Sequence, residues 1–331
     1  MRIPWRLVVG ILISVAALAL ILKDVSFPEL MERLGRARYG WMIPNVAAIL
    51  IAMWARAVRW RALLDDRLTT ARAFHIQNAG NLLNNVLPLR LGELGKAYLA
   101  SRDSTVTVMQ ALSSVLIERL LDVLSVFAML LVVLPYVPAR GVFVRGAEIV
   151  AAIALLGVVG LFVAAALRER AVAFARALIG GLPQAARDQI LARGDDFLRG
   201  VAAAGGRRLV AAIGWSVLVW LGFGSSCYFT LLAFAPGSAW YMGGFVNCAI
   251  ALGLTIPSAP SGAGLYEAAA VAGLAVFQIP RDTALAYAIV LHLSTFLVAA
   301  VMGVVGLERE GQSLDRLASA ARGVLGSMGK H

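Results

Sequence analysis

Three charged residues, Arg90, Glu93 and Lys96, stand three positions apart in a stretch that is otherwise mostly apolar. If the stretch is helical, Glu93 can pair with either basic neighbour. The planar guanidinium of Arg90 can hold a phosphate through two parallel hydrogen bonds. A charge at membrane depth is costly unless it is paired or hydrated, so such residues point to function. We therefore expect this group to bind an anionic headgroup, with an ion pair that only fixes helices as the alternative.

A second charged group follows. Glu118 and Asp122 are four residues apart and share one face of a predicted helix, with Arg119 beside them. Further along, Glu267 follows a break rich in Pro and Gly, and His292 lies inside an apolar segment. These residues either couple transport to protons or form an internal ion network that locks helices together. For His292, a hydrogen-bonded interior histidine is a simpler interpretation than a proton carrier.

Other kinds of chemistry find no support in the sequence. The histidines His75, His292 and His331 are far apart, and none lies near Cys227 or Cys248, so the spacing of a metal site is missing. Both cysteines lie in apolar stretches, as buried thiols do. We find no nucleotide-phosphate loop, no nucleophile motif and no nucleic-acid motif. We expect no metal, no cofactor and no nucleic-acid partner.

The elements that must position these residues are set by composition. Of 331 residues, 60% are hydrophobic and only 15% are charged, and the mean hydropathy is +0.81. Soluble domains are nearer half apolar and a quarter charged. This chain has too few polar residues to cover the water-facing surface of soluble domains. Disorder is excluded because apolar side chains are too abundant. The sequence predicts a single polytopic all-α membrane domain over residues 1–331.

The apolar segments divide into two kinds. Residues 71–101 and 240–279 are interrupted: each is an apolar helix, a break with Pro and Gly, and a second helix that opens with a glutamate. We predict a re-entrant hairpin at each, within two repeats at 41–134 and 209–307. Two unrelated kinked helices are the alternative, because Pro and Gly are common in membrane helices. The six uninterrupted segments, each near the roughly 20 residues that span a bilayer, are 7–22, 41–58, 113–134, 148–167, 209–234 and 283–307.

The distribution of basic residues predicts orientation. With both hairpins re-entrant and a cytoplasmic N-terminus, 21 of the 30 Lys and Arg fall on the cytoplasmic side and 7 outside, and Arg90 and Arg119 stay at membrane depth. This places both termini, including the tail 308–331, in the cytoplasm and makes the two repeats inverted. Residues 168–208 hold eight arginines at amphipathic spacing. We expect this segment on anionic lipid headgroups, with a solvated linker as the alternative.

The two breaks predict one shared ligand site. A hairpin tip exposes the first N–H groups of its second helix, which favour an anion, and a serine near the second break can cap that helix. Two inverted tips that meet near the membrane midplane would enclose an anionic headgroup between them. The predicted substrate-binding residues are Asn81, Asn85, Arg90, Glu93, Lys96, Ser258, Ser261, Gly262, Gly264 and Glu267.

Three motifs in order carry a family resemblance. They are Asn81-x-x-Asn84-Asn85-x-x-Pro88-x-Arg90-x-Gly92-Glu93, then Glu118-Arg119-x-x-Asp122, then Ile256-Pro257-x-x-Pro260-x-Gly262-x-Gly264-x-x-Glu267. Over about residues 6–307 the chain resembles the lysylphosphatidylglycerol synthase transmembrane region, a family also described as flippase-like. That family includes the flippase half of the bacterial multiple peptide resistance factor, stand-alone hopanoid-associated members, and archaeal relatives linked to lipid-carried glycans. The resemblance implies lipid handling, and we expect no aminoacyl-transferase domain in this chain.

Three function classes remain. We expect a transporter that moves a phospholipid, an aminoacylated phospholipid or an isoprenoid lipid, such as a hopanoid or polyprenyl phosphate, between leaflets of the bacterial cytoplasmic membrane. The second class is a membrane-embedded lipid or glycosyl transferase. The third is a non-catalytic partner subunit of lipid-synthesis enzymes, and a homo-oligomer is compatible with each. The candidate general bases of the transferase are Glu93, Glu118, Asp122 and Glu267.

Overall fold

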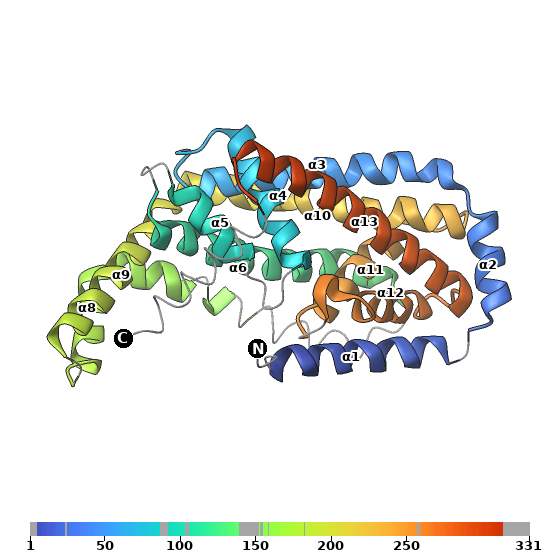
Figure 1. Cartoon of the computed structure of the whole chain (residues 1–331), viewed down its shortest axis with the longest axis horizontal. Coiled ribbons are helices and arrows are strands. Elements are labelled where there is room, and N and C mark those ends of the chain that lie inside the picture. The colour runs from blue at the N-terminus through green and yellow to red at the C-terminus, as the bar shows by residue number, and fades with distance from the viewer. Residues whose placement is uncertain are drawn as a thin grey trace.

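The computed structural model describes residues 5–23, 25–86, 92–102, 106–138, 152, 155–157, 159–181, 183–256 and 259–313. Within these ranges the chain forms helices joined by turns, without any strand (Figure 1). Among the described residues, three stretches are long and apolar enough to cross a membrane: Tyr39–Leu63, Arg207–Phe234 and Arg281–Arg309. This agrees with the expected all-α membrane protein.

The helices are named in chain order. They are α1 (Trp5–Leu22), α2 (Phe27–Arg36), η1 (Tyr39–Trp41), α3 (Met42–Leu63), α4 (Thr70–Val86), α5 (Gly92–Ser101), α6 (Val108–Val133), η3 (Leu134–Tyr136), α8 (Arg168–Leu178), α9 (Gln184–Ala203), α10 (Arg207–Phe234), α11 (Trp240–Gly253), η4 (Pro260–Gly262), α12 (Leu265–Ala275) and α13 (Arg281–Arg309).

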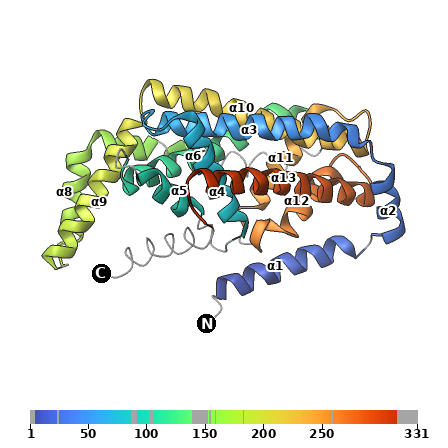
Figure 2. The ribbon, with the colours of Figure 1, turned by 45° about the horizontal axis from the view of Figure 1, so that its top comes forward.

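Helices α3 and α10 lie side by side and run in opposite directions (Figures 1 and 2). Trp41, just before α3, stacks on Phe229 near the end of α10, with 6.1 Å between ring centroids. Trp54, later in α3, contacts Trp215 near the start of α10 at 5.4 Å, edge to face. The two aromatic contacts therefore fix the antiparallel register of this pair.

Glycines allow the closest helix contacts. A Cβ atom on Gly222 of α10 would lie 2.8 Å from the Cβ of Ala52 in α3, and one on Gly303 of α13 would lie 2.4 Å from the Cβ of Leu82 in α4. In a membrane, helices associate through close packing of small residues rather than through the hydrophobic effect. Glycine at these positions thus brings α10 against α3 and α13 against α4.

The helix pairs α4–α5 and α11–α12 have their outer ends, where each pair begins and ends, at opposite ends of the molecule. At one end, Arg72 near the start of α4 donates to the carbonyl of Leu99 near the end of α5, at 3.3 Å. At the other end, Tyr241 at the start of α11 stacks on Tyr136 at the end of η3, 5.1 Å apart, and contacts Phe277 just after α12 at 6.0 Å. Each pair thus enters and leaves the bundle at a single end.

The packing partners repeat between the two halves of the chain. Within α3–α6 and within α10–α13, each helix packs on the next one in sequence. Between the sets, α4 packs on α13 as α11 packs on α6, and α3 packs on α13 as α10 packs on α6. Exchanging α3, α4, α5 and α6 with α10, α11, α12 and α13 therefore leaves this pattern of contacts unchanged.

The arginine-rich segment forms α8 and α9, which extend from one end of the bundle (Figure 1). Helix α9 is held on α6, where the hydroxyl of Thr107 donates to a carboxylate oxygen of Asp196 at 2.5 Å. Helix α8 packs on α9 and buries none of its described residues. Its side chains Phe174 and Leu178 are 67% and 70% exposed. This end therefore presents apolar side chains among its arginines.

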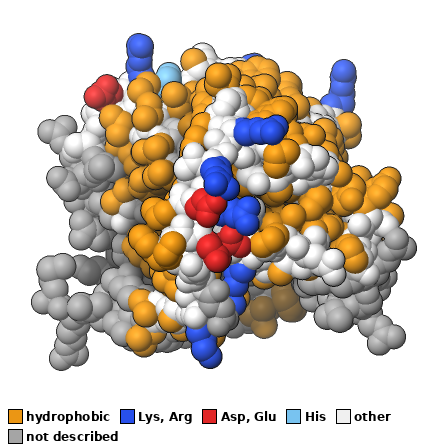
Figure 3. Space-filling model, turned by 90° about the vertical axis from the view of Figure 1, so that its right-hand side faces the viewer, with side chains coloured by type: hydrophobic (Ala, Val, Ile, Leu, Met, Phe, Trp, Pro, Cys, Tyr) orange, Lys and Arg blue, Asp and Glu red, His pale blue; other side chains and the backbone are white. Residues whose placement is uncertain are grey.

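The short helix α2, which the sequence did not predict, covers the opposite end. Leu30 is buried against the core, while Glu32 pairs with Arg36 at 2.7 Å on the exposed face. Arg33 pairs with Asp282 at the start of α13 at 2.8 Å. Figure 3 shows that charged side chains gather in the middle of this end, among hydrophobic ones.

Several predicted segments meet limits of the described chain. Parts of the predicted span 148–167 and most of the tail 308–331 lie outside the described residues, as do Arg90 and Ser258. In that span, the described residues 155–157 and 159–166 are helical. The predicted span at 113–134 is a helix, α6, but it carries three charged residues and is not one of the three candidate spans.

Candidate functional site

Glu118, on α6, accepts hydrogen bonds from three other helices. Its Oε1 atom accepts from Arg56 Nε and Arg59 Nη2 on α3 and from Gln77 Nε2 on α4, each at 3.1 Å. Its Oε2 atom accepts from Lys96 Nζ on α5 at 2.5 Å. The carboxylate is fully buried, so helices α3 to α6 converge on one buried negative charge.

Asp122 lies one helical turn further along α6 and shares the same arginines. Its Oδ1 accepts from Arg59 Nη1 at 2.8 Å, and its Oδ2 accepts from Arg56 Nη2 and Arg119 Nη1, both at 3.2 Å. Arg119 also pairs with Glu93 on α5. These side chains, with Glu118 and Lys96, form the charged cluster. The charged cluster holds four basic and three acidic groups and so carries one net positive charge.

Burial makes the charged cluster costly to disturb. Arg59 and Glu118 are both 0% exposed, and Lys96 is 3% exposed. The Lys96 ammonium also lies 4.2 Å from the centre of the Trp60 ring, where the face of the indole attracts a cation. Removing one partner of a buried pair typically costs about 3–5 kcal/mol, because the other charge is left unpaired.

Sequence reasoning found part of the charged cluster and misassigned its pairs. Glu93 pairs with Arg119 and Lys96 with Glu118, rather than with each other, because α5 packs on α6 and the two side chains meet different residues there. The 21 basic residues that the sequence places on the cytoplasmic side include Arg56, Arg59 and Lys96. This placement is wrong, because all three are buried or nearly buried in the charged cluster.

Some buried polar atoms near the charged cluster have no protein partner. Among the described residues these are Arg59 Nε, Gln77 Oε1, both amide atoms of Asn78, and Glu93 Oε2. Buried polar groups are nearly always hydrogen-bonded, so unpartnered atoms of this kind indicate where water or the polar part of a ligand can bind.

The first break is organised by an asparagine and two glycines. Asn84 Oδ1 accepts a hydrogen bond from Gly92 N, the first residue of α5, at 2.8 Å. A Cβ atom on Gly92 would lie 2.0 Å from the Gly80 carbonyl oxygen, so α4 and α5 touch backbone to backbone. The predicted residues Asn81 and Asn85 are half-buried on α4 beside this contact.

The second break is closed by Glu267 and His292. Glu267 Oε2 accepts from Gly264 N at 2.7 Å, and Oε1 lies 2.6 Å from His292 Nδ1. The other ring nitrogen, Nε2, lies 3.2 Å from the Ser261 carbonyl oxygen. The Tyr266 ring stacks on the imidazole, with 4.2 Å between centroids. The interior-histidine interpretation of His292 therefore fits its two contacts.

The start of α12 differs from the expectation. We expected a serine cap at Ser258 or Ser261, and N–H groups of Ser261, Gly262 and Ala263 that bind an anion. The N–H of Gly262 instead donates to the Ala259 carbonyl at 2.9 Å. The N-cap is instead Gly264, at φ +84°, and the Glu267 carboxylate accepts a hydrogen bond from the Gly264 N–H. The expected cap at Ser261 is therefore wrong. The Glu267 carboxylate at this helix start also opposes the binding of an anion there.

The second break contacts two other elements. Helix η4 packs on α4 of the first pair, so the two broken regions meet in space. Ser14 of α1 covers the other side: its hydroxyl accepts from Ala259 N at 2.9 Å, and its carbonyl adjoins Gly264. No pattern in the sequence predicts this role of α1.

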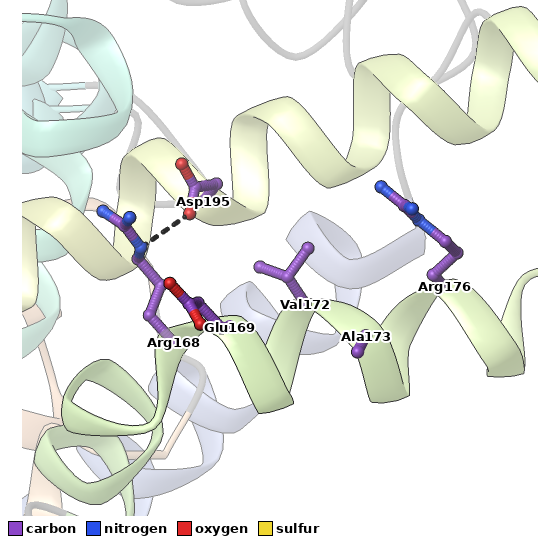
Figure 4. A pocket seen from close by; sticks show the side chains of 6 residues that line it. All are labelled: Arg168, Glu169, Val172, Ala173, Arg176 and Asp195. Atoms are coloured by element: carbon purple, nitrogen blue, oxygen red, sulfur yellow. Dashed lines mark ion pairs between the residues drawn. The ribbon is translucent and has the colours of Figure 1, made fainter.

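Two open cavities lie at the end of the molecule that carries α8 and α9, away from the charged cluster. One, of about 260 Å³, lies between α8 and α9, where Arg168 Nε pairs with Asp195 at 3.0 Å (Figure 4). The other, of about 540 Å³, lies where α4 begins and α13 ends, and Arg72, Arg102 and Arg309 line it. The second cavity is basic, with Glu310 as its acidic lining residue, whereas two acidic residues offset the two arginines that line the first.

Comparisons with known proteins agree with this architecture. Residues 7–303 match the family described as the lysylphosphatidylglycerol synthase TM region. The chain is also 26% identical over 339 aligned positions to a protein of Haloferax volcanii named glycosyltransferase AglD, across 90% of this chain and 53% of that protein. It thus spans about half the length of this curated relative. The family match includes the charged cluster and both helix breaks, and this chain belongs to the lysylphosphatidylglycerol synthase transmembrane-region family of multi-pass membrane proteins.

Proposed function

We propose that this protein binds the polar headgroup of an amphiphilic lipid inside the membrane and moves that lipid between leaflets. The observation that carries the proposal is the charged cluster: a buried site with one surplus positive charge and unpartnered polar atoms beside it. Ionisable groups at membrane depth mark a substrate path by default, and a headgroup can satisfy groups that the protein leaves free.

The proposed architecture has about six full transmembrane helices, two re-entrant hairpins (α4–α5 and α11–α12) and two inverted repeats. The opposite openings of the two hairpins support it, as do the antiparallel run of α3 and α10 and the exchangeable packing pattern. Broken helices of inverted repeats that meet near the midplane are typical of transporter binding sites. The contact of η4 with α4 would bring both breaks to one such site.

The groups around the charged cluster favour a phosphate-bearing lipid. The Arg119 side chain is 38% exposed, and a guanidinium binds phosphate oxygens through a planar fork. Glu93 Oε2 has no partner and can accept a hydrogen bond from a headgroup hydroxyl or ammonium. A phospholipid, an aminoacylated phospholipid or a polyprenyl phosphate satisfies both groups. A hopanoid hydroxyl satisfies one of them.

A membrane-embedded transferase is the second candidate, favoured by the printed name of the Haloferax volcanii relative. The match covers 53% of that protein, so its named activity need not reside in the matched half. A general base must have a lone pair free for a proton, whereas Glu118 accepts from four donors. Glu93, with one unpartnered oxygen, is the better candidate base. A role as the lipid-binding subunit of a synthetic enzyme would use the same site.

The proposed location is the bacterial cytoplasmic membrane, with both termini and the α8–α9 end in the cytoplasm. Arg56, Arg59 and Lys96 belong to the charged cluster; without them, 18 Lys and Arg remain on the proposed cytoplasmic side against 7 outside. Apolar side chains exposed on α8 fit a segment that rests on an anionic leaflet.

The test is reconstitution of the full chain into vesicles that contain a headgroup-labelled phosphatidylglycerol. Quenching of the outer-leaflet label reports translocation, and mass spectrometry of the same lipids reports any transferase product. We expect translocation without a new product, lost in Arg119→Ala but kept in Arg36→Ala, whose guanidinium is exposed at the far end. A new lipid product without translocation would favour the transferase, and equal translocation by both variants would refute the site.

A further inference from the structure

Both ring nitrogens of His292 face oxygen atoms. A neutral imidazole beside an ionised carboxylate has one proton too few for both contacts to be hydrogen bonds. Its Nδ1 atom faces Glu267 Oε1 at 2.6 Å, and its Nε2 atom faces the Ser261 carbonyl oxygen at 3.2 Å. A neutral imidazole carries one N–H group and one lone pair. Opposite an ionised Glu267, one ring nitrogen would therefore direct its lone pair at an oxygen.

One additional proton turns both contacts into hydrogen bonds. It can sit on the ring, so that both nitrogens donate, or on Glu267, which then donates to Nδ1 while Nε2 donates to Ser261. In either arrangement the pair is electrically neutral as a whole. Loss of that proton to water leaves one net negative charge and at least one repulsive contact, at a depth where an uncompensated charge is unfavourable.

We propose that Glu267 and His292 form a proton-binding site, and that the bound proton holds the turn Pro260–Gly264 closed. This goes beyond the proposed lipid function, because it assigns a second ligand and a conformational consequence. Release of the proton breaks the contact between Nε2 and Ser261 O and frees the turn.

The turn is suited to respond. Ser261 sits at φ +59°, in the left-handed region that a non-glycine residue seldom adopts, so its conformation depends on outside contacts. Its carbonyl contact with His292 is one of them. Ala259 N, just before the turn, is bound by Ser14 of α1. Because η4 also packs on α4, a change in the turn reaches the first hairpin.

The titratable groups described around Glu267 and His292 do not compete for this proton. Tyr266 stacks on the imidazole, and the hydroxyl of Tyr287 on α13 donates to the Cys227 carbonyl. Tyrosine and cysteine side chains are ordinarily neutral near pH 7. In the described part of α4, the titratable residues Arg72 and His75 line the cavity at the α8–α9 end, far from this turn.

The first test reads the protons directly. Full-length protein with ¹⁵N-histidine, carrying His75→Gln and His331→Gln so that His292 alone reports, is placed in lipid nanodiscs. The ¹⁵N shifts show which ring nitrogens carry protons across a pH series. We expect Nε2–H together with either Nδ1–H or an Nδ1 that accepts from the carboxyl group, and loss of this state at higher pH. A single N–H on Nδ1 with a bare Nε2 at every pH would overturn the proposal.

The second test reads the turn. Ser261→Cys is introduced into a protein that carries Cys227→Ala and Cys248→Ala, so that the new thiol alone is labelled. The substitution keeps the backbone carbonyl of residue 261, and maleimide labelling of the thiol is followed across the same pH series. Glu267→Gln serves as the matched control, because its amide can donate to Nδ1 without any extra proton. We divide the labelling rate of the protein that keeps Glu267 by the rate of the protein with Glu267→Gln. The pH dependence of the thiol itself is common to both rates and drops out of this ratio.

We expect that ratio to rise about tenfold per pH unit below the midpoint of proton release, and then to level off. A ratio that stays near one, with both proteins equally stable to heat, would overturn the proposal. Neither test measures lipid movement. A protein that translocates no lipid can still bind this proton, and one that does translocate lipid can still lack it, so the two proposals fail separately.

Discussion

Replacement of Glu118 by glutamine tests the energetic account of the charged cluster. Three donors face Oε1 at 3.1 Å, and Lys96 faces Oε2 at 2.5 Å. A glutamine amide has one oxygen, so its NH2 group must point either at Lys96 or at the other three donors. The change also raises the net charge of the charged cluster from one to two.

The expected loss of unfolding free energy is about 3 kcal/mol, the lower end of the range for breaking a buried pair. The lower end applies because Asp122 still pairs with Arg59 and Arg56. Lys96→Met added to Glu118→Gln should recover part of the loss, since the amide oxygen can then face the three donors and its NH2 group meets no cation. A negative coupling of this kind is what a double-mutant cycle measures.

The assay is denaturant unfolding of Glu118→Gln, Lys96→Met and the double variant in one detergent, with Glu32→Gln as the control. Glu32 pairs with Arg36 on an exposed face, where such a pair contributes at most about 1 kcal/mol. A Glu118→Gln protein as stable as the control would refute the reasoning. So would a double variant less stable than the sum of its single changes.

Further outcomes follow from helix packing, orientation and the arginine-rich end. Gly222→Val should destabilise the protein by about 1–3 kcal/mol through overpacking, measured by thermal unfolding, while Gly214→Val on the same helix, where nothing lies within 4 Å, should not. Cysteines introduced at Gln184 and Glu32 should react with an impermeant reagent from opposite sides of the membrane, and labelling of both from one side would contradict the inverted topology. Glutamine at three α9 arginines should weaken protection of α8 and α9 from hydrogen exchange in anionic nanodiscs, because each contributes about 1 kcal/mol at such a surface; unchanged protection would favour a solvated linker. The substituted arginines are Arg187, Arg193 and Arg199.

The long helices could be predicted because apolar periodicity over about 20 residues is a strong signal. Within the charged cluster, Glu118, Arg119 and Asp122 could be found because charges in the middle of an apolar segment stand out. Arg56 and Arg59 could not, because a basic residue near the end of a span looks the same whether it reaches the headgroups or turns inward. Only the position of the facing carboxylates separates the two cases.

The remaining differences have similar causes. Helix α2 was missed because it is short and its stability comes from the tertiary contact of Leu30 rather than from an isolated signal. The glutamate at Glu267 was identified, but its role as the cap of Gly264 depends on a backbone turn that no spacing rule reveals. The contact of Ser14 with the second break joins residues 245 positions apart, beyond the reach of local patterns.

The contact between α3 and α10 has a consequence for motion. When the two sets of helices are exchanged, the contact of α4 with α13 maps onto that of α11 with α6, and the contact of α3 with α13 maps onto that of α10 with α6. The contact of α3 with α10 maps onto itself. If the two halves swap conformations as the site turns from one leaflet to the other, this pair can keep its geometry while the hairpins move around it. The antiparallel pair, with Gly222 against Ala52, would then serve as the fulcrum of alternating access.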